Sequence, residues 1–410
     1  MKYVGYKVLV LALATGVATA SAQDFYAWNR VQPVSPVAGI PPQYRMAGLE
    51  AQPASIQHAG GPSLDGPNCG PPVSTPSCGY PAGTVCRRPG WFLSAEYLGW
   101  RTHRPFRPYV GLNTTGSFDP NEDTVVELED AVFDWDPGFR VNFGHVFDSG
   151  WDVGFTYTYF SNGGSAFTDD SLARLLPLEA HPGFIASSVS LGTSPGVEEA
   201  AASLQLDYNT YDLELGRSFC ICCSLVGRAF GGVRGAQIDE NTNYHYDNID
   251  SGTGLVIASD EVTHSSEMDG WGLRGGGSLN WNIGGSCHWS LYSRTALSLL
   301  LADFTNRRTE VIFDTDPLST FQGSLVATSE FYDVVPVMEM AAGIRYERER
   351  FWVAAGYEFS TWFNMVNDVR FVDDTNQANP IAQQSETQVI VLDRGNISFD
   401  GFFLQAGFVY

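Results

Sequence analysis

The ionisable side chains that could do chemistry in this chain alternate with apolar residues along short segments. Around residue 140, for example, Arg140 stands between Phe139 and Val141. A period of two places the charges of a strand on one face, and in a closed sheet that face lines the lumen. The predicted lumen-lining charges are Glu96, Arg140, Asp152, Asp207, Asp212, Glu214, Arg228, Arg234, Arg274, Arg294, Glu339, Arg345 and Glu358. Opposed charges there could pair and form a constriction that sorts solutes by size and sign, or they could form a salt-bridged plug that only fills the interior.

Two histidines are the remaining candidates for catalysis. His245 and His264 are predicted near the outer ends of strands, with Asp247, Asp260 and Ser265 nearby. A barrel protease or lipase needs a histidine beside an acid or a serine at its outer rim. Since no motif separates these residues from ordinary loop residues, we expect no enzyme, no catalytic residue and no cofactor.

Acidic residues gather in two predicted outer loops. They are Asp119, Glu122, Asp123, Glu127, Glu129 and Asp130 in one loop, and Asp373 and Asp374 in another. Such carboxylates could bind Ca²⁺ or bridge lipid headgroups through divalent cations. Calcium-loop spacing is missing, so solvated acidity is the preferred interpretation and no metal site is predicted.

Seven cysteines occur in a chain that is predicted to be exported: Cys69, Cys78, Cys86, Cys220, Cys222, Cys223 and Cys287. An oxidising compartment favours disulfides, and an odd number leaves one thiol spare or linked to another chain. The C-x-C-C spacing at 220–223 is not a usual structural zinc arrangement. Disulfides are therefore expected, but the sequence does not give their pairing.

The elements that must position these residues are ten predicted strands with period-two patterning. They cover residues 91–100, 135–143, 151–159, 204–215, 225–234, 271–283, 289–301, 338–346, 351–359 and 402–410. Most carry one apolar face, as a strand facing lipid requires. In 204–215 the apolar residues change from even positions (Leu204, Leu206 and Tyr208) to odd positions (Tyr211, Leu213 and Leu215). This change predicts a β-bulge near Thr210.

Short and long connections alternate along the chain. Tight turns are predicted near residues 148–150, 219–223, 284–286 and 347–350, and long loops at 102–133, 161–202, 239–266, 303–330 and 361–397. Outer-membrane barrels have short periplasmic turns and long outer loops. The predicted fold class is therefore all-β: a transmembrane up-and-down antiparallel β-barrel of about ten strands, or twelve if a hairpin of an outer loop inserts. The chain is too short for a sixteen-stranded general-diffusion porin.

The segments before the barrel have a different composition. Residues 1–22 have the basic start, apolar run and small-residue cleavage site of a secretory signal peptide, and residues 23–89 form a Pro/Gly-rich, Cys-containing periplasmic linker that precedes the barrel at 90–410. A run long enough for a transmembrane helix is not found. The formal net charge of −23 argues against nucleic acid as a partner.

The last strand carries a predicted assembly signal. Phe402, Leu404, Phe408 and Tyr410 share one face with Ala406, and an aromatic residue stands last. This pattern resembles the C-terminal signature that the outer-membrane assembly machinery recognises. The expected partners are therefore that machinery and outer-membrane lipid, and the oligomeric state stays open.

Several short motifs together suggest a family. They are Gly90 to Leu98, Tyr211 to Arg217, Gly231 to Arg234, Ala342 to Tyr346 and Phe402 to Tyr410. With them the chain resembles the pore-forming outer-membrane barrel family typified by the Legionella major outer membrane protein, and within it the planctomycete branch. The resemblance implies an outer-membrane location and a pore-forming or porin-like role, here with a narrow, charge-lined lumen. The alternative is a non-conducting structural or adhesive surface barrel.

Overall fold

The computed structural model describes residues 89–114, 125–170, 175–180, 196–222, 224–249, 253–283, 288–314, 323–348, 350–372 and 389–410. The predicted signal peptide, the predicted linker up to residue 88 and Cys69, Cys78, Cys86, Cys223 and Cys287 lie outside these ranges. So do Asp119, Glu122, Asp123, Asp373 and Asp374. No described helix is long and apolar enough to cross a membrane.

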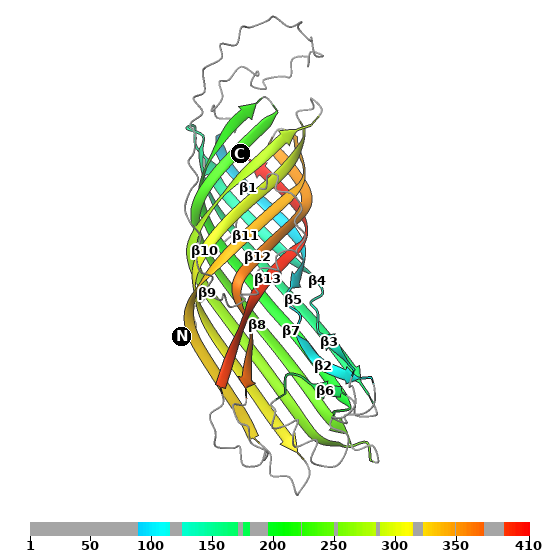
Figure 1. The fold of residues 1–410 in the computed structure, drawn as a ribbon. Coiled ribbons are helices and arrows are strands. Elements are labelled where there is room, and N and C mark those ends of the chain that lie inside the picture. The colour runs from blue at the N-terminus through cyan, green and yellow to red at the C-terminus, as the bar shows by residue number, and fades with distance from the viewer. Residues whose placement is uncertain are drawn as a thin grey trace, which may run out of the picture. The chain divides into compact units, whose positions relative to one another are not determined.

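A ring of ten antiparallel strands forms the barrel (Figure 1). Around the ring the order is β1, β13, β12, β11, β10, β9, β8, β7, β5 and β4, and β4 pairs with β1 to close it. The all-β fold class and the strand number of ten are confirmed. Their bounds are β1 Gly90–His103, β4 Trp135–Val146, β5 Trp151–Asp169, β7 Glu199–Cys222, β8 Leu225–Ile249, β9 Val256–Asn282, β10 Trp289–Asp314, β11 Gly323–Arg348, β12 Phe351–Val372 and β13 Val389–Val409.

Tight turns connect the strands at one end of the barrel. Between β4 and β5 the chain reverses within four residues, where Phe147 N–H donates to Trp151 O and Gly150 has a φ of 78°, a left-handed conformation that favours glycine. The links from β7 to β8, β9 to β10 and β11 to β12 lie at the same end. The predicted turn at 148–150 is confirmed. The other three predicted turns include residues 223, 284–286 and 349, which lie outside the described residues, although the strands on either side of each are antiparallel neighbours. By the general asymmetry of such barrels this is the periplasmic end.

At the other end the strands are much longer than expected. A tilted membrane strand needs about 9–11 residues, yet β9 has 27 and β10 has 26. Most of the residues predicted as long loops at 239–266, 303–330 and 361–397 are strand instead, and β5 extends into 161–202 as far as Asp169, so the predicted loop bounds were wrong. We call the part of the barrel toward the turns the membrane section and the part beyond it the outer section.

The two sections have opposite polarity on β7. Its register with β5 and β8 is continuous through Thr210, so the predicted bulge there was wrong. Even-numbered residues face inward along the whole strand: Leu206 and Tyr208 in the outer section, then Asp212 and Glu214 in the membrane section. The apolar side chains change face because the solvent outside changes from water to lipid, not because the strand slips.

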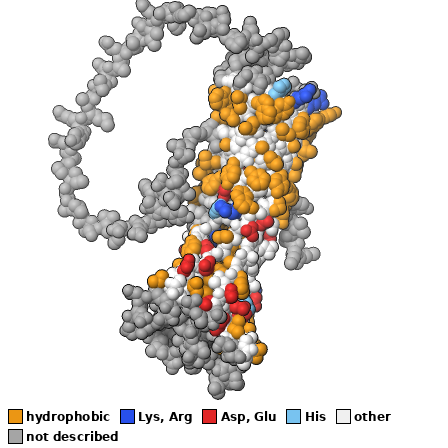
Figure 2. Space-filling view, turned by 90° about the vertical axis from the view of Figure 1, so that its right-hand side faces the viewer, with side chains coloured by type: hydrophobic (Ala, Val, Ile, Leu, Met, Phe, Trp, Pro, Cys, Tyr) orange, Lys and Arg blue, Asp and Glu red, His pale blue; other side chains and the backbone are white. Residues whose placement is uncertain are grey.

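The outer surface of the membrane section is apolar. Large exposed apolar side chains, such as Leu213, Leu273 and Leu299, cover the membrane section. Figure 2 shows hydrophobic side chains over the upper part of one face and Asp and Glu side chains gathered below them. An apolar band of this kind is the surface that lipid covers.

The outer section has an apolar core of its own. Ile238, Met268, Leu300 and Phe304 point into it and are buried. A small sheet of β2 (Pro108–Asn113), β3 (Val126–Asp130) and β6 (Leu175–Pro177) lies in the chain between β1 and β7 and adds buried Tyr109, Val110 and Leu175 to this core. The interior of the outer section is thus filled with side chains.

Candidate functional site: the charged lumen and the aromatic layer

The membrane section encloses a network of arginines and carboxylates. Every predicted lumen-lining charge except Asp207 lies on the inward face of its strand: Glu96, Arg140, Asp152, Asp212, Glu214, Arg228, Arg234, Arg274, Arg294, Glu339, Arg345 and Glu358. Asp207 lies on the outward face and is half-buried. Its predicted position was wrong because it depended on the bulge at Thr210.

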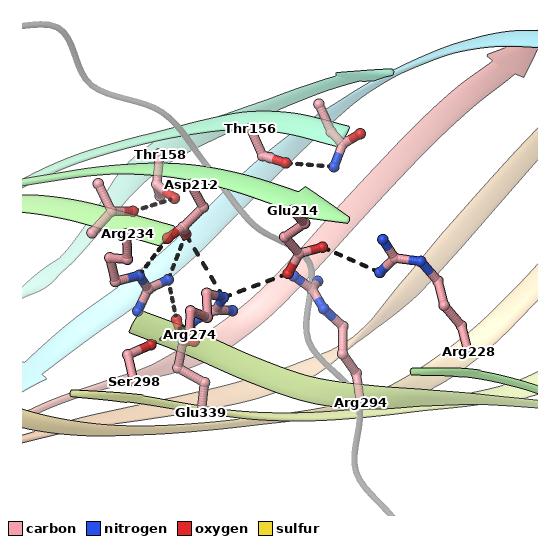
Figure 3. A network of polar contacts seen from close by, with 12 residues as sticks. Thr156, Thr158, Asp212, Glu214, Arg228, Arg234, Arg274, Arg294, Ser298 and Glu339 are labelled. Carbon is pink, nitrogen blue, oxygen red and sulfur yellow. Dashed lines mark hydrogen bonds and ion pairs between the residues drawn. The ribbon is translucent and has the colours of Figure 1, made fainter. Parts of the chain in front are cut away.

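The centre of the network is Arg234 on β8 (Figure 3). Its Nε donates to Asp212 Oδ1 at 2.8 Å and its Nη2 donates to Asp212 Oδ2 at 2.7 Å. Nη2 also lies 2.9 Å from Glu339 Oε1, and Arg274 from β9 contacts the other oxygen of the same carboxylate. Because β8 and β11 are not neighbours in the ring, this network crosses the lumen.

Two further clusters extend the network. Arg228 binds both oxygens of Asp152, with Nε at 3.0 and 3.1 Å, and reaches Glu214 at 3.2 Å. On the other side Arg140 bridges two carboxylates, Glu96 at 2.9 Å and Glu358 at 2.8 Å. Charge-assisted pairs of this kind are strong in a confined interior, and each fixes the position of its partners.

An aromatic layer lies directly above the charged network, toward the outer section. We use this name for Trp100, Phe160, Tyr208, Trp362 and Phe399, none more than 2% exposed. Their ring centroids are 4.7–6.0 Å apart along the chain of contacts. Trp100 joins the layer to the network, since its Nε1–H donates to Glu358 at 3.0 Å.

This layer spans the full width of the barrel. Tyr208 belongs to β7 and Trp362 to β12, which stand five places apart in the ring of ten, and their rings touch at a centroid distance of 5.6 Å. Arg234 lies 5.8 Å from the Trp362 ring and supports it from below. Side chains from opposite walls therefore meet, and the lumen is closed at this level.

Sequence reasoning missed the aromatic layer. It placed Leu204, Leu206 and Tyr208 on the lipid-facing side, and it placed Phe160 and Trp362 next to or inside long loops. A signal was present in the sequence, because alternate residues of a strand face the same side. Even-numbered positions on these strands carry both the inward charges and the aromatic residues Trp100, Phe160, Tyr208 and Trp362.

The outer section holds a second group of buried charges. Arg107 and Arg308 both contact the carboxylate of Glu179, at 3.2 and 3.3 Å. Asp260 is fully buried, and burial together with the nearby Glu310 raises the pKa of Asp260 from 3.8 to about 9. One of these two carboxyl groups is therefore expected to hold a proton at neutral pH.

The structure does not assemble the hydrolase candidates into one site. His245 faces outward and contacts Asp247 at 3.0 Å, whereas His264 faces inward and is fully buried. Asp260 shares the inward face with His264 but stands four residues away on the same strand, roughly 13 Å at about 3.3 Å per residue. Ser265 lies on the opposite face from both.

The remaining predicted residues lie at the ends of the barrel. Phe402, Leu404, Phe408 and Tyr410 are exposed on the outer wall, from the level of Gly99, which pairs with Phe402, to the turns beside Phe408 and Tyr410. Cys220 and Cys222 lie at the end of β7 on the periplasmic side, and Glu127, Glu129 and Asp130 lie in β3. The disulfide pairing and the divalent-cation interpretation stay predictions.

Comparisons with known proteins place this geometry in a family. The outer membrane protease OmpT from Escherichia coli is 11% identical, with 78% of this chain and 97% of that chain covered and a TM-score of 0.40. The TodX deltaS2S3 mutant monoaromatic hydrocarbon channel is 10% identical, with 79% and 91% covered and a TM-score of 0.31. No curated protein sequence matches the chain. A family model described as Legionella pneumophila major outer membrane protein precursor matches residues 84–410. The chain belongs to this outer-membrane protein family, and its ten-stranded ring is an outer-membrane β-barrel.

Proposed function

We propose that the protein is a pore for small hydrophilic solutes and that the conformation described here is its closed state. The observation that carries the proposal is the junction of two layers: a charged lumen through the membrane section ends against the aromatic layer, where Tyr208 touches Trp362. Rings of charged side chains and hydrophobic constrictions are the two devices by which pores select and gate.

The charged network favours a pore over a salt-bridged plug that only fills the interior. A buried ion pair is often no more stabilising than apolar residues of the same volume, so a barrel that only needs to be filled gains little from so many charges. Arg228 and Glu339 also keep 14% of their side-chain surface accessible. Partial access suits a lumen that is hydrated from the periplasmic end.

A second candidate is a permanently closed surface barrel with a structural or adhesive role. The apolar core of the outer section favours it, because Ile238, Met268 and Phe304 fill the space above the aromatic layer. In this case the membrane section would serve only as an anchor for the outer section.

Planar-bilayer recording of the purified full-length protein separates the two candidates. For a closed pore we expect rare openings in the wild type and a several-fold larger open fraction in Trp362→Ala, because the contact across the lumen is lost. Trp281→Ala is the matched control, since Trp281 lies on the lipid-facing surface and is 55% exposed. Electrical silence of Trp362→Ala, in protein that still migrates as a folded barrel on unheated gels, would support the surface-barrel candidate instead.

We also propose that residues 1–22 are removed on export, which leaves Gln23 as the first residue, and that the cysteines form disulfides. Intact-mass measurement of protein purified from outer membranes, with and without reductant, tests both points. A mass that includes residues 1–22 contradicts the first, and the same gain in mass on alkylation with and without prior reduction contradicts the second.

A further inference from the structure

The wall of the barrel splits between β11 and β12, just above the aromatic layer. Among the described residues the last backbone pair of these strands is Val337 with Trp362, although β11 continues to Gly323 beside β10 and β12 continues to Val372 beside β13. On the other side, the last pair of β13 with β1 is Ser398 with His103. Beyond these points, residues 363–372 and 389–397 form a two-stranded outer hairpin whose described backbone pairs are internal.

At the split, specific residues replace the backbone hydrogen bonds that the edge of β11 would otherwise make. Pro336 has no N–H to give to a neighbouring strand. At Val334 the backbone N–H donates to Asp333 Oδ1 at 2.7 Å, and the carbonyl oxygen accepts from Asn364 Nδ2 at 3.2 Å. Side chains thus satisfy groups that would otherwise pair with β12, which is a common way to end a sheet edge.

A hinge in β12 lies beside this edge. Asn364 has a φ of 63°, and the register with β13 shifts between Trp362 and Met365 and again between Val366 and Asp368. Bulges bend a strand and interrupt its ladder. An isolated two-stranded hairpin is only marginally stable, so the outer hairpin depends on its side-chain contacts to stay in place.

An ion pair and the buried apolar side chains of Met365, Val366 and Ile397 hold the outer hairpin in place. Arg394 on β13 contacts Asp333 on β11, donates to Asn364 Oδ1 at 3.2 Å and lies 4.9 Å from the Phe331 ring. The two charged side chains are 37% and 27% exposed. Exposed pairs contribute about 0–1 kcal/mol, so the ion pair itself opens easily. Movement of the hairpin also shifts Met365, Val366 and Ile397 against the apolar core.

We propose that the outer hairpin is a flap hinged at Asn364, that Arg394 and Asp333 are its latch, and that its opening provides a lateral exit from the lumen. Trp362 is the last paired residue before the hinge and the member of the aromatic layer that meets Tyr208. Movement of the hairpin therefore shifts Trp362 and opens its contact with Tyr208 across the lumen. This inference rests on the proposed pore function, and it names the route that solutes take around the filled outer section.

The chemistry of the exit indicates what passes. A charged pair that is exposed does not lie in hydrocarbon, so the split opens at the level of headgroups and water. Thr361 and Ser398, which share a hydrogen bond of 3.0 Å, add further polar groups beside it. Small hydrophilic solutes are the class that this route admits.

Single-channel recording of latch variants tests the flap. We expect Asp333→Asn and Arg394→Gln each to raise the ratio of open to closed time about fivefold, which is the equilibrium change that corresponds to about 1 kcal/mol. The charge swap Asp333→Arg with Arg394→Asp restores an ion pair and is expected to return the ratio to within about twofold of wild type. Glu261→Gln is the control, because Glu261 is exposed on the outer wall of β9, away from the split, where its carboxylate accepts a hydrogen bond from Asn243 at 3.2 Å.

The possible outcomes separate the flap from the pore itself. Latch variants that gate like wild type, together with a conducting Trp362→Ala, would overturn the flap and leave the pore intact. A charge swap that gates like the single variants would overturn the ion pair as the latch. Silence of every variant, Trp362→Ala included, would overturn the pore and the exit with it.

Discussion

At the scale of single residues, Arg234 contributes most to holding the lumen together. It is 1% exposed, binds Asp212 with two hydrogen bonds, reaches Glu339 and lies under Trp362. Loss of one partner from a buried pair is much more costly than replacement of both, because the remaining charge has neither water nor a counter-ion.

Arg234→Gln is therefore expected to destabilise the barrel by about 3–5 kcal/mol. Urea unfolding in detergent, followed by tryptophan fluorescence, measures this change. Arg345→Gln serves as the comparison, since its partner Glu347 is 52% exposed and such pairs contribute about 1 kcal/mol or less. Equal losses for the two variants would contradict the central place given to Arg234.

Asp260 gives the outer section a dependence on pH. Burial and Glu310 raise its folded-state pKa from 3.8 to about 9, while Arg308 opposes the shift. The folded state thus holds a proton that the unfolded chain releases, so the stability from this group is full below pH 3.8 and is lost as the pH rises toward 9.

The wild-type barrel is accordingly expected to lose stability between pH 5 and pH 8, and Asp260→Asn is expected to lose less. Urea unfolding midpoints at the two pH values test this. Glu261→Gln is the matched control because Glu261 is the next residue and is exposed on the outer wall. If Asp260→Asn keeps the full pH dependence, Asp260 is not its source.

At the scale of elements, a long strand such as β7 passes from lipid in the membrane section to water in the outer section. In β7 and β8, outward positions are apolar where lipid surrounds the wall and polar where water does, and inward positions do the reverse. The strand keeps its period of two throughout. A single substitution should therefore have opposite consequences at equivalent outward positions of the two sections.

Arg substitutions at two outward positions test this exchange of faces. Leu213→Arg puts a charge in the lipid-facing band, where Arg costs about 2–4 kcal/mol near the bilayer midplane. Asn241→Arg puts the same charge on the outer section, where Asn241 is exposed, and is expected to change stability by less than about 0.5 kcal/mol. Unfolding midpoints in lipid vesicles give both values, and a large loss for Asn241→Arg would contradict the assignment of the outer section to water.

Sequence reasoning predicted the membrane section well and the outer section poorly. Residues 151–159 alternate Trp, Val, Phe and Tyr with small or polar residues, so the strand, its tight turn and its inward Asp152 could all be predicted. The outer section keeps the same period, but its apolar residues, such as Tyr244 and Tyr246, face inward. A search for outward apolar faces assigns these residues to loops.

The aromatic layer and the split could not be predicted for a different reason. Trp362 and Tyr208 meet across the ring, and the identity of opposite strands is known only once the strand number and closure are fixed. The change at Thr210 had two explanations, a bulge or an exchange of solvents, and one strand alone does not distinguish them. The residue types of Pro336 and Asn364 do not indicate which strands separate there.

At the scale of the whole barrel, the exchange of faces must occur at one height on every strand. It lies between Asn209 and Leu213 on β7 and between Leu301 and Asp303 on β10. The aromatic layer, the hinge and the split all lie near this height. The closed pore therefore depends on a single claim, that β7 and β10 leave the lipid there without a change of register.

A spin-label scan along β7 and β10 tests that claim most directly. Labels are placed at odd positions 205–215 and 297–307, which face outward, and at even positions 204–214, which face inward. The collision rate of each label is measured with oxygen, which enters lipid, and with a water-soluble nickel chelate. We predict nickel access up to residue 209 and from residue 303 onward, oxygen access at 213, 215 and 297–301, and immobile labels at even positions 204–214. Mobile, lipid-exposed labels at 204, 206 and 208 would contradict the account, because they would show a register change at Thr210.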